Sequence, residues 1–223
     1  MLKKTLFIGA IMSVFALAGC STEQTDILNT GKDSTNQSST SASTSTETLN
    51  AENVNSDGTS AAITEKIDFE TMYPDNDIRN YAKGFIGQKA PDFKLTNLEG
   101  KEVQLSDFKG KNLILEIAQT TCSACIQTQP EIDKFKKDHP DLPLVQVFPM
   151  ENSGVVREFL TKLNSPEHKN ILTGDKGNTF VRDYKAKWTP TLYFINKDGV
   201  ISFLHVGSTD ADFLLDMTKR VFE

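Results

Sequence analysis

In the second half of the chain, an apolar run is followed closely by a pair of cysteines. Residues 113–118 are apolar apart from one glutamate, as is typical of a strand that is buried on both faces of a sheet. Cys122 and Cys125 follow after a short segment, and the spacing of apolar residues over 122–137 predicts a helix that begins at the first cysteine. A buried strand that leads directly into a helix indicates a fold in which strands and helices alternate.

Periodicity and chain-breaking residues predict the other elements of this part of the chain. Alternation over 93–96 and 103–105, on either side of a turn at 97–100, predicts a hairpin. Further strands are expected at 142–148, 171–173, 191–195 and 200–206, with helices at 67–84, 155–163, 179–184 and 210–222. Because strands and helices alternate before a closing hairpin, we expect an α/β domain with a mixed central sheet flanked by helices.

The composition changes sharply along the chain. From 21 to 60, 18 of 40 residues are Ser or Thr, and no aromatic residue occurs between Phe15 and Phe69. Such a segment cannot bury enough apolar surface to offset the entropy lost on ordering its backbone. We therefore expect residues 20–66 to be a flexible tether and residues 67–223 to form one domain, with its core at 87–223.

The first residues have the pattern of a secretory signal. Lys3 and Lys4 precede an apolar run at 6–17, which is too short for a permanent membrane helix of about 20 residues. The run ends in LAGC, which resembles the lipobox of bacterial lipoproteins and implies removal of 1–19 and lipidation of Cys20. An ordinary signal peptide with a chance cysteine is the alternative.

The net charge of the chain bears on its partners. It is −6 at pH 7, whereas phosphate contacts need clustered Lys and Arg, so we expect no nucleic acid partner. An acidic chain is also not attracted to anionic lipid, so its attachment to a membrane would depend on the acyl chains of Cys20.

The position of Cys122 at the start of a helix favours thiol chemistry. A thiolate is the reactive form, and the pKa of a free cysteine is about 8.5. The unpaired N–H groups and the macrodipole at a helix N-terminus stabilise that negative charge. Cys125 lies on the same helical face and within disulfide reach. Cys122 can therefore attack a disulfide, and Cys125 can resolve the mixed disulfide that results, without a cofactor other than the pair itself.

Two structural roles for the pair fit the sequence less well. A zinc site needs two further ligands, and His139, His168 and His205 are not arranged as a ligand pair, so we expect no metal. A purely structural disulfide would close a loop too short to remove much entropy from the unfolded chain. Redox chemistry is the favoured interpretation.

From about residue 87 to its C-terminus, the chain resembles thioredoxin-fold thiol-disulfide oxidoreductases of the TlpA/ResA type. The resemblance rests on APDFKL at 90–95, LSDFKGK at 105–111, WTPTLYFI at 188–195 and Pro130, which lies eight residues after Cys122. It implies a thioredoxin-like fold with an N-terminal hairpin extension.

The resemblance also implies roles for individual residues. Pro190 would be cis, and the Thr189 backbone would pair with an extended segment of a partner, with Thr121 in the same contact surface. Glu116, the one charge in the apolar run, would serve Cys125 as acid or base, and its burial should raise its pKa. The alternatives are an ordinary trans proline and a glutamate that faces solvent.

We expect such a protein to exchange disulfides with extracytoplasmic proteins, as a monomer, with a membrane protein as its electron-transfer partner. The direction of exchange is open, and family analogy slightly favours reduction. The sequence departs from the family pattern at Thr121, where Trp is usual, at Ala124, where Pro is common, and at Thr128, where ResA-type proteins have Glu.

Two other functions share part of this pattern. Peroxiredoxins have a similar entry hairpin, but their Pro-x-x-x-Thr-x-x-Cys motif is not matched, because Leu115 and Gln119 precede Cys122 at the corresponding positions. Thioredoxin-fold copper chaperones have Cys-x-x-x-Cys and a distal histidine. The spacing here is one residue short, although His205 lies downstream and soft thiolates suit Cu(I). A peroxidase and a copper-binding chaperone are therefore kept as alternatives.

Overall fold

The computed structural model describes residues 68–223. The predicted signal sequence, the lipidation site at Cys20 and the whole of the tether lie outside the described residues. Within 68–223, no helix has the length and apolar character needed to cross a bilayer.

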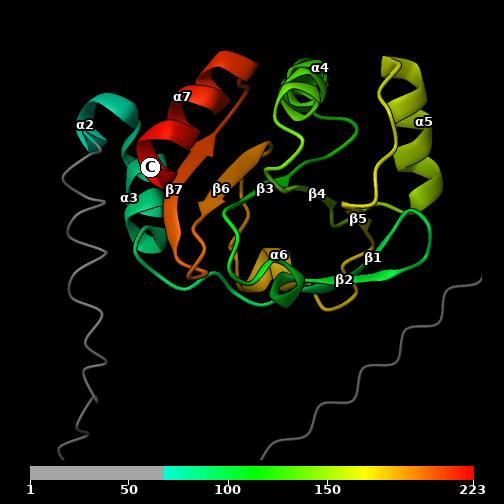
Figure 1. Cartoon of the computed structure of the whole chain (residues 1–223), viewed down its shortest axis with the longest axis horizontal. Coiled ribbons are helices and arrows are strands. Elements are labelled where there is room, and N and C mark those ends of the chain that lie inside the picture. The colour runs from blue at the N-terminus through cyan, green and yellow to red at the C-terminus, as the bar shows by residue number, and fades with distance from the viewer. Residues whose placement is uncertain (1–67) are drawn as a thin grey trace, which may run out of the picture. The chain divides into compact units, whose positions relative to one another are not determined.

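The described residues form a seven-stranded sheet with helices on both faces (Figure 1). The strands are β1 (Lys94–Asn97), β2 (Glu102–Gln104), β3 (Leu113–Ile117), β4 (Leu144–Phe148), β5 (Ile171–Thr173), β6 (Thr191–Ile195) and β7 (Ile201–Val206). The helices are α2 (Phe69–Met72), α3 (Asn76–Phe85), the 3-10 helix η1 (Leu105–Phe108), α4 (Ser123–Asp138), α5 (Ser153–Leu163), α6 (Thr179–Arg182) and α7 (Ala211–Phe222). The strand order is β2-β1-β5-β4-β3-β6-β7.

Strand β3 lies in the interior of the mixed sheet. It pairs in parallel with β4 and antiparallel with β6. All five of its residues are buried, which explains why the sequence there is nearly all apolar. The prediction of an α/β domain with a mixed sheet is confirmed.

The connections determine which face each helix covers. The crossovers from β3 through α4 to β4 and from β4 through α5 to β5 both join parallel neighbours in the same direction across the sheet. Because such crossovers are right-handed, α4 and α5 lie on the same face, where α7 joins them, and α6 lies on the other face (Figure 1).

The entry hairpin extends one edge of this sheet. Strands β1 and β2 are antiparallel, with Leu95 opposite Val103, and β1 also pairs with β5. Gly100 closes the turn with a φ of 82°, a left-handed conformation that glycine adopts without strain. The predicted hairpin is confirmed.

The predicted helical lead-in is also confirmed, as two helices. Asp68 and Asp75 are the N-caps of α2 and α3, each accepting backbone N–H groups of its helix, as short acidic side chains commonly do. The Tyr81 hydroxyl, from α3, is hydrogen-bonded to the Tyr193 hydroxyl and donates to the Tyr184 carbonyl at 2.7 Å. This aromatic contact attaches α3 to the same face as α6.

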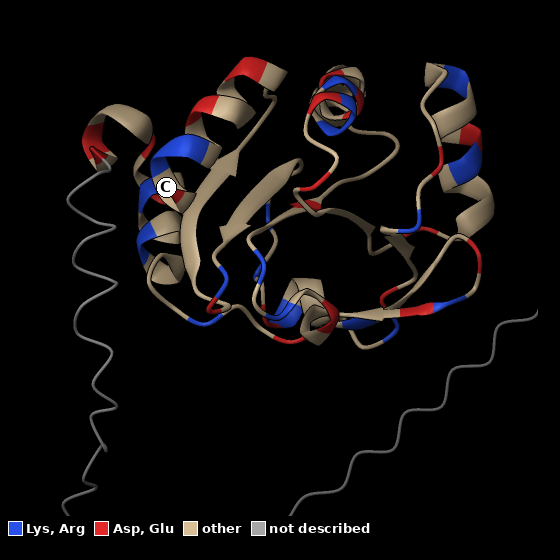
Figure 2. Ribbon diagram, in the orientation of Figure 1, with Lys and Arg blue, Asp and Glu red and all other residues tan. Residues whose placement is uncertain are grey.

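Acidic and basic residues are interspersed along the helices of the described domain (Figure 2). Some form i,i+4 ion pairs, such as Lys162 with Glu158 on α5 and Arg220 with Asp216 on α7. These side chains are exposed, so each pair contributes little to stability.

Candidate active site

Cys122 is the N-cap residue of α4, at the end of the segment that leaves β3. Its φ and ψ of −81° and 120° are extended, and its Sγ accepts the backbone N–H of Cys125 at 3.3 Å. The cysteine thus takes the capping role that Ser or Asp commonly has. Its sulfur lies where the free N–H groups of the helix point. Both cysteines are free thiols in the structure.

The surroundings of Cys122 favour its thiolate. Partial burial acts to raise the pKa of this thiol, but hydrogen bonds from the Cys125 and Thr189 side chains and from the backbone N–H groups of Cys125 and Ala124 outweigh it. The pKa of Cys122 is therefore lower than that of an ordinary cysteine.

Cys125 has the opposite character. Its side chain is only 2% exposed. Burial raises its pKa far above the ordinary value, and the hydrogen bond with Cys122 and the negative charge of Glu116 add to the rise. Cys122 therefore ionises first, and Cys125 stays protonated until a base acts on it.

The loop before β6 contacts the first cysteine. The Cys122 thiol donates to the Thr189 carbonyl oxygen at 3.1 Å, and the Thr189–Pro190 peptide bond is cis. The Pro190 carbonyl in turn accepts the backbone N–H of Gly207 at 2.9 Å. The structure thus brings the cysteine, the proline loop and the segment after β7 together.

Glu116 lies inside the domain, at the level where β3 faces α4. Its side chain is 1% exposed, and its Oε2 accepts a hydrogen bond of 2.8 Å from Gln146 Nε2. Burial raises the pKa of Glu116 to about 7, the hydrogen bond from Gln146 opposes the rise, and the charge of Asp133 adds to it. Glu116 therefore does not face solvent, and it can exchange a proton near neutral pH.

Two functional neighbours were not predicted from the sequence. Gln146 interrupts the apolar run of β4 and is fully buried; a polar residue in such a run was the available signal. Glu151 accepts the Thr120 backbone N–H at 2.9 Å and the Thr120 hydroxyl at 2.7 Å. It thereby holds the segment that leads to Cys122, and nothing in the local sequence pattern indicates that contact.

Thr121 and Thr128 lie on either side of the cysteine pair. Thr121 is exposed beside Cys122. Thr128 is fully buried, and its Oγ1 accepts the backbone N–H of Thr209 at 3.2 Å. Where ResA-type proteins have a glutamate, this chain therefore has a small hydroxyl that joins α4 to the segment after β7.

The three histidines make contacts of their own. His139 packs against Phe135, His168 lies 2.9 Å from Gln146 Oε1, and His205 lies 3.2 Å from the Ser208 carbonyl. Among residues 68–223, no group of three or more His, Cys, Asp or Glu side chains is arranged to hold a metal ion.

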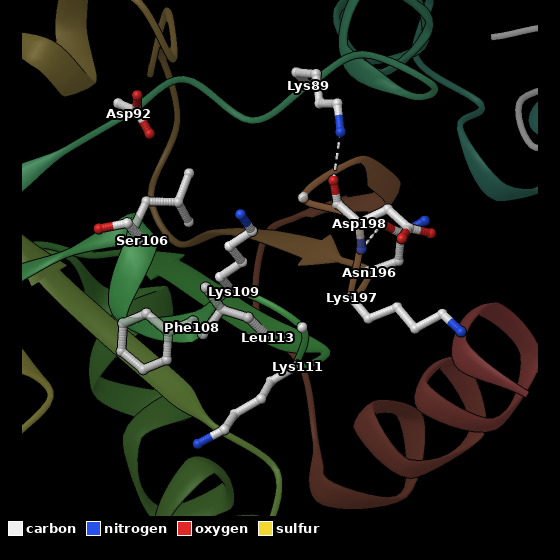
Figure 3. A pocket seen from close by; sticks show the side chains of 13 residues that line it. Lys89, Asp92, Ser106, Phe108, Lys109, Lys111, Leu113, Asn196, Lys197 and Asp198 are labelled. Carbon is white, nitrogen blue, oxygen red and sulfur yellow. Dashed lines mark hydrogen bonds between the residues drawn. The ribbon is translucent and has the colours of Figure 1, made fainter.

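A pocket of about 550 Å³ lies outside the cysteine site, between η1 and the β6–β7 turn (Figure 3). Leu105, Phe108 and Leu113 are among its apolar lining residues. Lysines also line it, but Lys111 and Lys197 extend away from each other (Figure 3), so their charges do not converge on one point. We therefore place the candidate active site at the cysteines and not in this pocket.

A second pocket, of about 330 Å³, lies beside the proline loop. It is lined by Gln127, His205, Ser208, Thr209, Asp210 and Phe213. The hydrogen bonds of Gly207 with Pro190 and of Thr209 with Thr128 connect its wall to the cysteine site.

Comparison with known proteins supplies independent evidence. The Redoxin family model matches residues 85–218. The chain is 35% identical over 143 residues to the thioredoxin-like protein YneN of Bacillus subtilis (strain 168), covering 61% of this chain and 76% of YneN. It is 30% identical over 138 residues to the thiol-disulfide oxidoreductase ResA of Bacillus thuringiensis subsp. konkukian (strain 97-27), covering 61% of this chain and 78% of that protein.

A solved structure shows the same fold. A protein from Chlorobium tepidum that is assigned as the thiol:disulfide interchange protein DsbE superimposes with a TM-score of 0.53 and 28% identity, covering 61% of this chain and 97% of that one. The matched family region contains both cysteines, Glu116 and the proline loop.

Proposed function

The chain belongs to the redoxin family and is a thiol-disulfide oxidoreductase, and from this premise we propose that it acts through Cys122 and Cys125 with no further cofactor. The observation that carries the proposal is the asymmetry of the two thiols. The pKa of Cys122 is lowered at a helix N-terminus, and the pKa of the buried Cys125 is raised. One sulfur is thus suited to attack, and the other is held back until a mixed disulfide exists.

In the reducing direction the reaction has two steps. The Cys122 thiolate attacks a sulfur of the partner's disulfide, so that a Cys122–partner bond forms as the partner's own S–S bond breaks. The partner's other sulfur leaves as a thiolate and takes a proton from water. Glu116 then accepts the proton of Cys125, whose thiolate attacks Cys122 and releases the partner's second thiolate, which is protonated in turn. The partner gains two electrons, and the pair becomes a disulfide.

We propose reduction as the working direction, with electrons returned to the Cys122–Cys125 disulfide by a membrane partner. The same steps run backwards in an oxidant, and the reduction potential distinguishes the two cases. A value near the −270 mV typical of thioredoxin supports a reductase, and one near the −120 mV typical of DsbA supports an oxidant.

The partner would bind as an extended segment along the proline loop. The Thr189 backbone lies next to Cys122 and can pair with such a segment as a short added strand. Thr121 is exposed next to Cys122, and the 330 Å³ pocket that includes Ser208 and Thr209 also lies near this loop.

The proposed location of the protein is outside the cytoplasm, on a membrane. Residues 1–19 would be removed, Cys20 would carry lipid, and 20–66 would hold a monomeric domain away from the bilayer. Membrane fractionation of the wild type and of Cys20→Ala tests this part: release of the variant supports it, and retention contradicts it.

A trapping experiment tests the proposed chemistry. In Cys125→Ser the second step cannot occur, so covalent adducts with disulfide-containing partners should accumulate on Cys122 and disappear on reduction. Cys122→Ser is the matched control and should form none. Adducts in the control instead would overturn the assignment of the nucleophile. Peroxide consumption or Cu(I) uptake by the reduced wild type, without adducts, would favour the peroxidase or the copper chaperone.

A further inference from the structure

A continuous set of polar side chains, buried at Glu116, Gln146 and Gln129, extends from Glu116 towards the far end of α4. Gln146 Nε2 donates to Glu116 Oε2 and to Gln129 Oε1, each at 2.8 Å. Gln129 Nε2 donates to Asp133 Oδ1 at 3.0 Å, and Gln146 Oε1 lies 2.9 Å from His168 Nε2. Gln146 and Gln129 are 0% and 2% exposed, so these amides have little access to water with which to replace their hydrogen bonds.

The two ends of the network determine the direction of every bond. Asp133 can only accept when ionised, so Gln129 presents its N–H₂ group to Asp133 and its oxygen to Gln146. The reverse orientation of Gln146 would bring its oxygen against the Gln129 oxygen and, when Glu116 is ionised, against that carboxylate as well. His168 Nε2 contacts Gln146 Oε1, so this ring nitrogen must carry a proton to form the hydrogen bond. Only one assignment therefore satisfies all of these contacts.

We propose that Gln146 is a positioning residue of the exchange reaction: its amide N–H₂ group holds the Glu116 carboxylate under α4, near Cys125. The hydrogen bonds of Gln146 with His168 and Gln129 fix the orientation of this amide. This inference rests on the proposed role of Glu116 as the base for Cys125. The register of the sheet supports it, because Gln146 is the direct β4 neighbour of Glu116. A residue of other shape or polarity there would leave the buried carboxylate without its donor.

The charged groups around Glu116 act in known directions. On α4, Asp133 raises the pKa of Glu116 by repulsion, and Cys125 is itself affected by the Glu116 charge. Beyond Gln146, burial and the charge of Lys136 lower the pKa of His168 to about 3, so it is neutral in the working range. His205, on β7, is directed to the Ser208 carbonyl. Gln146 and Asp133 therefore act oppositely on Glu116: loss of the Gln146 donor raises its pKa, and loss of the Asp133 charge lowers it.

Reaction of the reduced protein with dithiobis(nitrobenzoate) separates the two steps in one experiment. The first coloured anion is released when Cys122 attacks, and the second when Cys125 resolves the mixed disulfide. The pH at which the rate of the second phase reaches half its maximum reports the pKa of Glu116. Losing a hydrogen bond to a carboxylate shifts a pKa by about one unit. In Gln146→Leu we therefore expect the midpoint to rise by about one pH unit and the second phase at pH 7 to slow about fivefold, with the first phase unchanged.

Asp133→Asn is the second variant, because it keeps an acceptor for Gln129 and removes only the charge. It should shift the midpoint of the second phase downwards, and it tests the network even if Gln146→Leu fails to fold. A midpoint equal to that of the wild type in the folded variants would overturn the positioning role. Absence of the first phase in the wild type would instead overturn the proposed function, so the two failures are distinguishable.

Discussion

The Sγ atom of Cys122 lies 3.1 Å from the carbonyl oxygen of Thr189, the residue that precedes the cis proline. A thiol can donate to this carbonyl, but a thiolate cannot. Ionisation of Cys122 therefore frees the Thr189 carbonyl at the moment when the sulfur becomes reactive. The same backbone can then accept a hydrogen bond from an arriving partner segment.

The first prediction concerns the ionisation of Cys122. Because the hydrogen bonds to its sulfur outweigh the effect of burial, we expect the thiolate to form at a pH below the ordinary value of about 8.5. Thiolate absorbance of the reduced protein, measured as a function of pH, gives this midpoint. Cys122→Ser is the control and should lose the low transition, because the pKa of Cys125 is raised. A first transition at or above the ordinary value would contradict the prediction.

Replacing Glu116 by Gln tests its role as the base. The amide has nearly the same shape but cannot take the Cys125 proton, so we expect resolution of a mixed disulfide at pH 8 to slow by about 100-fold. Attack by Cys122 should change little, because Glu116 is not among the groups that shift the Cys122 pKa. Rapid mixing with a model disulfide measures both steps. Equal rates of resolution in variant and wild type would remove Glu116 from the reaction.

The sequence predicted those parts of the fold that local periodicity specifies. The entry hairpin, the buried strand β3 and the helix that Cys122 caps are all present. In each of these, the alternation or spacing of apolar residues within a few positions indicates which side is buried, so no knowledge of the rest of the chain is needed.

The contact between Glu116 and Gln146 could not be predicted in this way. It depends on the register of two parallel strands that are joined through α4, and a one-residue shift would place Gln146 on the other face. The contact of Glu151 with Thr120 likewise depends on how two loops meet at the ends of β3 and β4. The cysteine motif identified the chemistry, but the residues that support it come together only in the folded sheet.

The pKa of Glu116 also predicts how stability varies with pH. It is raised from 4.5 to about 7 in the folded protein, so between these values the unfolded chain loses the proton first. The contribution of Glu116 to stability is therefore largest below pH 4.5 and falls as the pH rises to 7, by about 3 kcal/mol. Chemical denaturation at pH 5 and pH 8 should show that Glu116→Gln gains stability relative to the wild type at the higher pH. An equal difference in stability between variant and wild type at pH 5 and at pH 8 would contradict the raised pKa of Glu116.

His168 should have the opposite effect. Its pKa is lowered from 6.5 to about 3, so below pH 6.5 the unfolded chain binds a proton that the folded protein does not. The wild type should lose stability as the pH falls from 6.5 towards 3. In His168→Asn, whose amide can still donate to Gln146, this part of the acid sensitivity should disappear. Denaturation midpoints at pH 4 and pH 7 measure this loss of stability. An equal loss in the variant and in the wild type would show that the pKa of His168 is not lowered.

The last prediction concerns Glu151, which lies outside the redox pair. It accepts two hydrogen bonds from Thr120, and such bonds to a charged group contribute about 1.5–3 kcal/mol each when partly buried. We expect Glu151→Ala to lower the free energy of unfolding by about 3 kcal/mol and to slow attack by Cys122, because the segment that places the sulfur is released.

Glu158→Ala is the matched control for Glu151→Ala. Glu158 pairs with Lys162 on the exposed side of α5, where a surface ion pair contributes little to stability. Urea denaturation and the rate of the first thiol reaction are measured for both variants. Of these two glutamates, Glu151 is the one that contacts the segment before Cys122. Only Glu151→Ala should therefore change both the free energy of unfolding and the rate of the first thiol reaction. If the two variants behaved alike, the carboxylate of Glu151 would have no role in placing the nucleophile.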